Sequence, residues 1–136
     1  MIYEGTITYT KVDETGKSVN CKESYVLEDK LSFAEVESFL FNYFGSFENV
    51  DVVAVKRSNI KEIVNQKSSE QDKIYKATVC DIFLNEDTGK EKELRYDILL
   101  FALNIEKAHA FISAYLSQGY NMVLKSLKET KYVDTL

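Results

Sequence analysis

The sequence predicts a single α+β domain formed by tandem duplication of a β-β-α-β unit, with two helices and a mainly antiparallel sheet or sheets. Three observations lead to this fold class: two helical stretches with matching apolar residues, a glycine-containing turn before each, and an apolar strand after each. All three recur in the same order at an offset of 72 or 73 residues. A recurrence in order indicates a repeat, so we expect two half-repeats related by a pseudo-twofold axis.

The two predicted helices begin at Ser32 and Asn104, which are both suited to cap a helix N-terminus. Glu35 stands at the capping-box position of the first helix. Gly45 and Gly119 follow the two helices, where a left-handed residue commonly ends a helix. The apolar residues of both helices have the spacing of one helical face. They are Phe33, Val36, Phe39, Leu40, Tyr43 and Phe44 in the first helix, and Ile105, Ala108, Phe111, Ile112, Tyr115 and Leu116 in the second.

A β-hairpin is predicted before each helix. The turns are Glu-Thr-Gly-Lys at 14–17 and Asp-Thr-Gly-Lys at 87–90, in which glycine supplies a positive φ. Alternating strands flank the first turn, and the second turn lies between strands at about 73–85 and 91–102. A last strand follows each helix. These last strands run over 50–55 and 122–127.

The polar segment 65–72 joins the half-repeats, which cover about 1–64 and 73–136. A half of about 65 residues buries too little surface to be stable alone. We therefore expect one domain over residues 1–136, in which the halves share one sheet or face each other across one core.

Composition restricts the class of protein. The net charge is −5, no run approaches the roughly 18 apolar residues of a membrane span, and the N-terminus alternates like a strand rather than a secretion signal. We expect a cytoplasmic protein that does not bind membranes, with Cys21 and Cys80 as free thiols. These cysteines and His109 lack the close spacing of metal ligands, so neither a metal nor a cofactor is predicted.

No catalytic site is predicted. The sequence lacks the motifs of nucleophile elbows, phosphate-binding loops, dinucleotide-binding turns and zinc proteases. His109 is the only histidine and takes the place of Glu37 in the repeat, off the apolar helical stripe. We expect it to be exposed, and the protein to be a non-enzymatic binding protein.

Two groups of residues are candidates for binding. Six basic residues at corresponding places of the halves could track a phosphate backbone, or could simply aid solubility. They are Lys56, Arg57, Lys61, Lys125, Lys128 and Lys131. Phe83 and Phe101 fall where an outer strand face should be polar, and Phe41 has Ser113 as its counterpart. These three rings could form a protein interface, and exposed aromatic residues could also stack on bases.

Four stretches spread over nearly the whole chain resemble one domain family of unknown function. They are Leu-Ser-Phe-Ala-Glu-Val-Glu at 31–37, Lys-Arg-Ser-Asn at 56–59, Tyr-Lys-Ala-Thr-Val at 75–79 and Lys-Glu-Thr at 128–130. The family occurs in Bacteroidetes and in their phages and mobile elements. The resemblance implies an intracellular accessory protein of such an element, and it assigns no role to any residue.

Three functions follow from these observations and stay open at this point. The first is a protein-interaction module that dimerises or binds a host protein. The second is an accessory protein that binds single-stranded DNA or RNA through the basic residues and aromatic rings. The third is a protein that sequesters a nucleotide or another small ligand at the cleft between the halves.

Overall fold

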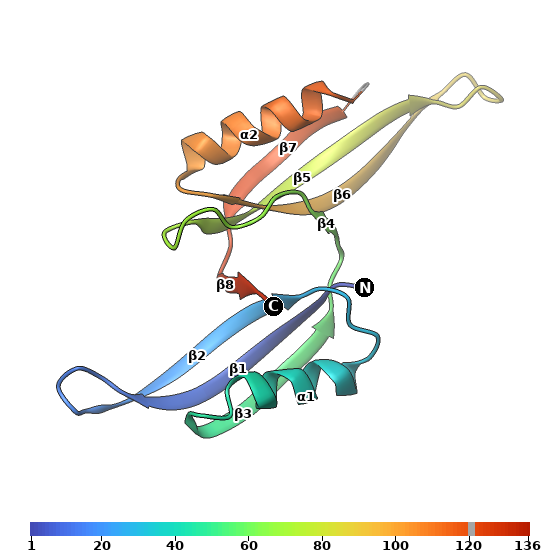
Figure 1. The fold of residues 1–136 in the computed structure, drawn as a ribbon. Coiled ribbons are helices and arrows are strands. Elements are labelled where there is room, and N and C mark those ends of the chain that lie inside the picture. The colour runs from blue at the N-terminus through green and yellow to red at the C-terminus, as the bar shows by residue number, and fades with distance from the viewer. Residues whose placement is uncertain (120–121) are drawn as a thin grey trace. The chain divides into compact units, whose positions relative to one another are not determined.

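A computed structural model describes residues 1–119 and 122–136 of the chain. The chain forms two compact units, which we call unit 1 (residues 1–58 and 131–136) and unit 2 (residues 59–130). Unit 1 contains β1 (Tyr3–Val12), β2 (Ser18–Leu27), α1 (Phe33–Tyr43), β3 (Glu48–Arg57) and β8 (Tyr132–Thr135). Unit 2 contains β4 (Ile60–Ile63), β5 (Lys73–Leu84), β6 (Glu91–Ala102), α2 (Ile105–Ser117) and β7 (Met122–Glu129). Figure 1 shows these elements.

The α+β prediction is confirmed: residues 1–119 and 122–136 form two helices and two mainly antiparallel four-stranded sheets. The strand order is β3-β1-β2-β8 in unit 1 and β4-β6-β5-β7 in unit 2. Each half of the sequence therefore supplies the same order of elements, which is compatible with the predicted duplication. The pseudo-twofold axis stays a prediction.

The hairpins form where the turn sequences predict them. Strand β1 pairs antiparallel with β2, and β5 with β6, in one continuous register each. Gly16 and Gly89 take φ values of +83° and +68°, as predicted. In the first turn, the Asp13 carboxylate accepts hydrogen bonds from the Thr15 and Lys17 backbone N–H groups, both at 2.9 Å. Together with the Thr15 hydroxyl, these bonds lower the pKa of Asp13.

Both predicted N-caps are confirmed. The Ser32 hydroxyl accepts a hydrogen bond from the Glu35 N–H at 3.1 Å, and the Asn104 side chain accepts one from the Lys107 N–H at 2.9 Å. The Glu35 carboxylate reaches one residue further than a capping box requires, and it accepts from the Leu31 N–H at 2.9 Å.

The prediction for the helix ends was wrong, because neither Gly45 nor Gly119 has a positive φ. Gly119 is instead a place of close approach, since a Cβ there would lie 2.5 Å from the Met122 Sδ. Helix α1 ends at Phe44 with an ordinary φ of −99°.

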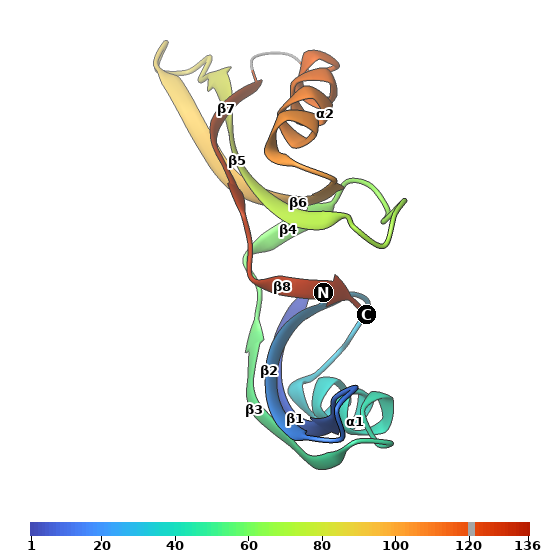
Figure 2. The same cartoon turned by 90° about the vertical axis from the view of Figure 1, so that its left-hand side faces the viewer.

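Each unit has its own core between its helix and one face of its sheet. In Figure 2 each sheet curves around its own helix. Val36 and Leu40 of α1, together with its C-cap residue Phe44, pack on Ile7 and Leu27, among others, in unit 1. In unit 2, Ala108, Ile112 and Leu116 of α2 do the same against β5 and β6. Of the two arrangements expected for the halves, a single shared sheet is not formed, because each unit has its own sheet. We call the sheet face that the unit's own helix does not cover the open face.

The two short strands β4 and β8 are exchanged between the halves of the sequence. Strand β4 follows β3 after two residues but pairs parallel with β6 in unit 2, and β8 follows β7 after two residues but pairs parallel with β2 in unit 1. The two-residue connections that precede β4 and β8 are alike. In the first, the Ser58 N–H donates to the Ile2 carbonyl, and in the second the Thr130 N–H donates to the Ile74 carbonyl, both at 2.9 Å. The predicted β-β-α-β unit lacked this fifth strand.

Side chains and the C-terminus hold the exchanged segments in place. The Leu136 N–H donates to the Val26 carbonyl at 2.7 Å, and Leu136 packs against the unit 1 core. After β4, the Asn65 side chain forms the two backbone hydrogen bonds that a neighbouring strand would form with Phe101. It donates to the Phe101 carbonyl at 2.9 Å and accepts from the Phe101 N–H at 2.7 Å. The predicted joint 65–72 therefore begins with a residue that belongs to the sheet of unit 2.

Neither helix in the described ranges is long and apolar enough to cross a membrane.

Deleting residues 131–136 should destabilise unit 1, because β2 loses its parallel neighbour and the core loses Leu136. We expect the free energy of unfolding of unit 1 to fall by about 1–3 kcal/mol, the scale of a few hydrogen bonds and one apolar side chain. Hydrogen exchange of the Val26 and Glu28 amides should accelerate, while the β5 and β6 amides stay protected. Unchanged exchange in β2 would contradict this role of β8.

Candidate interaction sites

The six predicted basic residues are all exposed, and three lie in each unit. The strand exchange assigns Lys61 to unit 2 and Lys131 to unit 1, so each unit carries basic residues from both halves of the sequence. Several of these side chains have local partners: the Lys56 Nζ lies 3.4 Å from a Glu4 carboxylate oxygen, and the Lys61 Nζ lies 4.1 Å from the centre of the Tyr96 ring.

One cross-strand contact on the open face of unit 2 concentrates positive charge. Lys128 of β7 stands opposite Lys76 of β5. The corresponding pair in unit 1 is Lys56 with Glu4, which have opposite charges. Lysines that face each other across strands repel, and an anion placed between them would relieve the repulsion. The sequence reasoning did not single out Lys76. Its neighbours Tyr75 and Ala77 are core residues, and because side chains alternate along a strand, Lys76 lies on the face away from the core.

The three predicted interface phenylalanines differ in exposure. Phe41 on α1 is 39% exposed, and Phe83 near the end of β5 is 45% exposed. Phe101 of β6 is 6% exposed, so its ring is buried in this structure. Their role in an interface stays a prediction.

Most aromatic contacts in unit 1 lie on the helix side of the sheet. Tyr9 packs on Phe44 and Phe47 with ring centres 5.2 and 4.5 Å apart, and Tyr25 packs on Phe44 at 5.3 Å. Tyr9, Tyr25 and Phe44 belong to the core of unit 1. These rings therefore serve packing, and they are not a stacking surface for bases.

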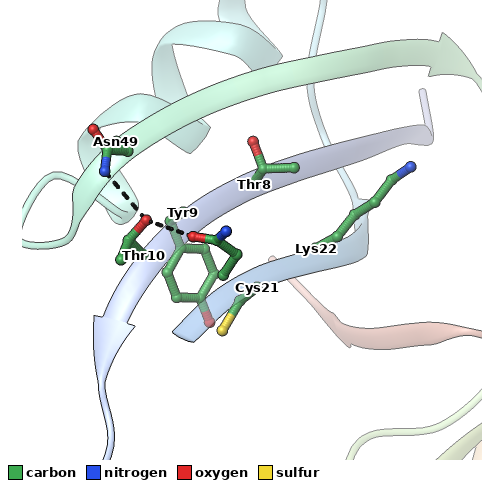
Figure 3. Close-up of a pocket in the computed structure, with 7 residues that line it drawn as sticks. Thr8, Tyr9, Thr10, Cys21, Lys22 and Asn49 are labelled. Carbon is green, nitrogen blue, oxygen red and sulfur yellow. Dashed lines mark hydrogen bonds between the residues drawn. The ribbon is translucent and has the colours of Figure 1, made fainter. Parts of the chain in front are cut away.

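The open face of unit 1 bears a shallow polar hollow near the end of the first hairpin, shown in Figure 3. Thr8 and Lys22 lie on this side of the sheet, whereas Tyr9 and Cys21 point to the other side. The Asn49 side chain donates to the Thr10 hydroxyl at 3.2 Å, and that hydroxyl donates to Asn20 at 3.1 Å. Asn49 has a left-handed φ of +54°. These polar groups bond one another, so the hollow offers little to a ligand beyond Lys22 and Thr8.

A carboxylate on the helix side of unit 1 accepts hydrogen bonds from two tyrosines. Both the Tyr9 and Tyr25 hydroxyls donate to Glu23, the latter at 3.2 Å. Burial, followed by the interaction with Glu23, raises the pKa of both tyrosines. Both phenols therefore stay protonated at neutral pH and keep their hydrogen bonds to Glu23.

In unit 2, a hydrogen bond between a tyrosine and a carboxylate connects β4 to α2. The Tyr115 hydroxyl of α2 donates to the Glu62 carboxylate of β4 at 2.6 Å. This hydrogen bond, with burial, raises the pKa of Tyr115 from 10.0 to about 12. Tyr96, under the Lys61 ammonium, also has a raised pKa, mainly through burial.

The outer sheet edges of the two units carry different residues at their bulges. In the described residues, β3 pairs only with β1 and β7 only with β5, so both are edge strands. Each contains a β-bulge at the same place: Val53 has no partner between Thr6 and Ile7, and Lys125 has none between Thr78 and Val79. Val53 and Lys125 also correspond at the repeat offset of 72.

Lysine at an edge discourages further strand pairing, because its charge would have to leave water. Strand β7 has such a residue at its centre, whereas β3 has Val53, which is 47% exposed, within the apolar run 52–55. The sequence contained this difference, but its meaning depends on the bulge, which sequence reasoning did not predict.

The remaining candidates for chemistry are two cysteines and one histidine. Cys21 and Cys80 are free thiols, as predicted, and Cys80 is buried. His109 is exposed on α2, as expected. Within residues 1–119 and 122–136, no three His, Cys, Asp or Glu side chains are grouped so that they could hold a metal ion.

Comparison with known proteins gives one match. The profile of a family described as a domain of unknown function (DUF4494) matches residues 1–136. The chain belongs to this family. No curated protein and no solved structure matches the DUF4494 chain significantly. The predicted resemblance to a family of unknown function is thereby confirmed, while the association with Bacteroidetes and phages stays a prediction.

The Tyr115–Glu62 bond of the DUF4494 chain predicts a pH dependence. The folded state binds the Tyr115 proton more tightly than the unfolded chain does, so the bond stabilises the fold fully below about pH 10. This contribution is lost as the pH rises through about 12. In a Glu62→Gln variant the pKa of Tyr115 should fall toward 10.0. NMR titration of ¹³C-labelled tyrosine, assigned with Tyr115→Phe, measures this shift, and identical titrations in both proteins would contradict it.

Proposed function

We propose that this protein is a non-enzymatic interaction module that binds an extended protein segment along the outer edge of β3. The observation that carries the proposal is the exposed Val53 at the bulge of an edge strand whose counterpart carries Lys125. An accessory role in a phage or mobile element, in which the bound segment belongs to a host protein, fits the same proposal and rests on the resemblance described first.

Strand addition suits the β3 edge for two reasons. An added strand hydrogen-bonds to backbone N–H and C=O groups that otherwise meet only water, which supplies affinity with little demand on sequence. The apolar run 52–55 then selects a partner with apolar side chains at its centre. Burying the exposed half of one valine contributes about 1 kcal/mol, and each net hydrogen bond contributes about 0.5–1.5 kcal/mol.

Replacing Val53 with lysine should abolish this binding. The ammonium group would lie where the added strand packs, so we expect the affinity for extended peptides to fall about tenfold or more, which corresponds to about 1.4 kcal/mol. Wild type and V53K would be compared on an array of apolar, β-branched peptides of about ten residues, with affinities of the bound peptides measured by fluorescence anisotropy.

The reciprocal change provides the matched control. Lys125→Val removes the lysine from β7 and should leave binding at β3 intact or add a second binding edge. Thermal unfolding of all three proteins checks that the fold is unchanged. Peptides that bind V53K as tightly as wild type would refute the role of β3.

The position of Lys76 opposite Lys128 on neighbouring strands favours nucleic-acid binding as a second candidate function. A phosphate group between the two ammonium groups on the open face of unit 2 would relieve their repulsion. In the next opposed pair on that face, Ser126 carries a hydroxyl group that suits a phosphate contact, whereas the Thr78 hydroxyl donates to the Asp97 carboxylate at 2.6 Å.

This second function has its own test. Anisotropy of labelled single-stranded DNA should show binding that weakens steeply between about 50 and about 200 mM salt. Lys128→Gln should weaken it further and reduce the salt slope by about one, whereas Lys17→Gln in the first hairpin turn should not. If the affinity changed neither with salt nor in the Lys128→Gln variant, a phosphate contact at this pair would be excluded.

A further inference from the structure

We infer that the partner of the β3 edge is a second copy of this chain, paired antiparallel through β3 of each copy. The inference rests on the proposed function, because it requires β3 to accept another strand. Its specific basis is the order of charges along β3, in which acidic residues stand near one end and basic residues at the other. Glu48 and Asp51 precede the apolar run, and Lys56 and Arg57 follow it.

Sheet faces restrict which residues can meet in such a pair. Strands of one sheet place side chains of the same face beside each other. The register with β1 assigns Glu48, Asp51, Ala54 and Lys56 to the open face, since they stand opposite Thr10, Thr8, Thr6 and Glu4. Val52 and Val55 point to the helix face, where they pack against the core.

Antiparallel self-pairing brings the opposite charges together. Aligning two copies at Val52 places Glu48 of one copy opposite Lys56 of the other. Asp51 takes the place of Glu48 after a shift by two positions of the β1 register, which is three residues of β3 because of the bulge between Glu48 and Asp51. Both registers form two symmetric ion pairs around an apolar centre, because a twofold contact repeats every interaction. Lys56 lies near Glu4 of its own chain at 3.4 Å, so in the dimer it would be located between two carboxylates.

Strand β7 lacks this self-complementarity. Val123 stands where β3 has Asp51, and Lys128 stands where β3 has Lys56, so Lys128 would find no aspartate opposite it in the second register. The two copies of Lys125 would approach each other at the centre and repel. The two edges share one bulged geometry, yet only β3 carries the residues of a symmetric contact in the residues described.

Charge-swapped variants test the inference, because they change side chains and leave the backbone hydrogen-bonding groups of β3 in place. Lys56→Glu alone places an acid opposite Glu48 and Asp51, and the Glu48→Lys/Asp51→Lys variant alone places lysines opposite Lys56. Each variant should therefore be monomeric, with the dimer dissociation constant raised about tenfold or more. An equimolar mixture pairs acid with base at both sites and should dimerise again. Sedimentation equilibrium from about 1 to about 100 µM measures all four samples.

Each outcome decides the inference. A concentration-dependent wild-type dimer, loss in each single variant and recovery in the mixture support it, because a misfolded variant would not recover by mixing. The inference is overturned if the wild type is a monomer throughout the concentration range. It is also overturned if the charge-swapped variants dimerise as tightly as the wild type. If the wild type is monomeric but still binds peptides in a manner that V53K abolishes, self-pairing fails while the proposed function stands. If V53K binds those peptides unchanged, the proposed function itself fails.

Discussion

The parallel pairing of two short strands, β8 with β2 and β4 with β6, is the contact on which the organisation of this chain depends. Each pair gives a three-stranded antiparallel sheet its fourth strand from the other half of the sequence. Four-residue strands form few hydrogen bonds, so other groups must hold them. Leu136 does so in unit 1, while Asn65 and the Glu62–Tyr115 pair do so in unit 2. Two separate cores are thereby joined by exchanged backbone.

Sequence reasoning succeeded where the signal is local. Ser32 and Asn104 cap the helices because the capping bond spans three residues, and Gly16 and Gly89 form turns because positive φ is a property of one residue. It failed where the partner is remote. A four-residue strand has too few positions for a periodic pattern, and Ile60 of β4 finds its partner at Asp97 of β6. Gly119 resembled a helix stop, but its φ is not positive.

In the candidate interaction sites, too, the sequence identifies the residue types but not their neighbours in the fold. The lysines and arginine on the strands were identifiable by type, yet their meaning depends on cross-strand neighbours: Glu4 beside Lys56, and Lys76 beside Lys128. Val53 differs from Lys125 in the aligned repeats, but a valine in a strand is ordinary. It becomes informative because the bulge leaves it without a partner and exposes it at an edge.

The exchange of β8 also has a consequence for biosynthesis. Unit 2 is continuous over residues 59–130, whereas unit 1 combines the first 58 residues with the last six. A ribosome delivers the N-terminal strands first, and domains tend to fold in the order in which they emerge. Here the unit that emerges first is completed last, after the inserted unit 2 has left the exit tunnel. Until residues 131–136 are delivered, the nascent sheet of unit 1 therefore presents two bare edges, and β8 then closes one of them.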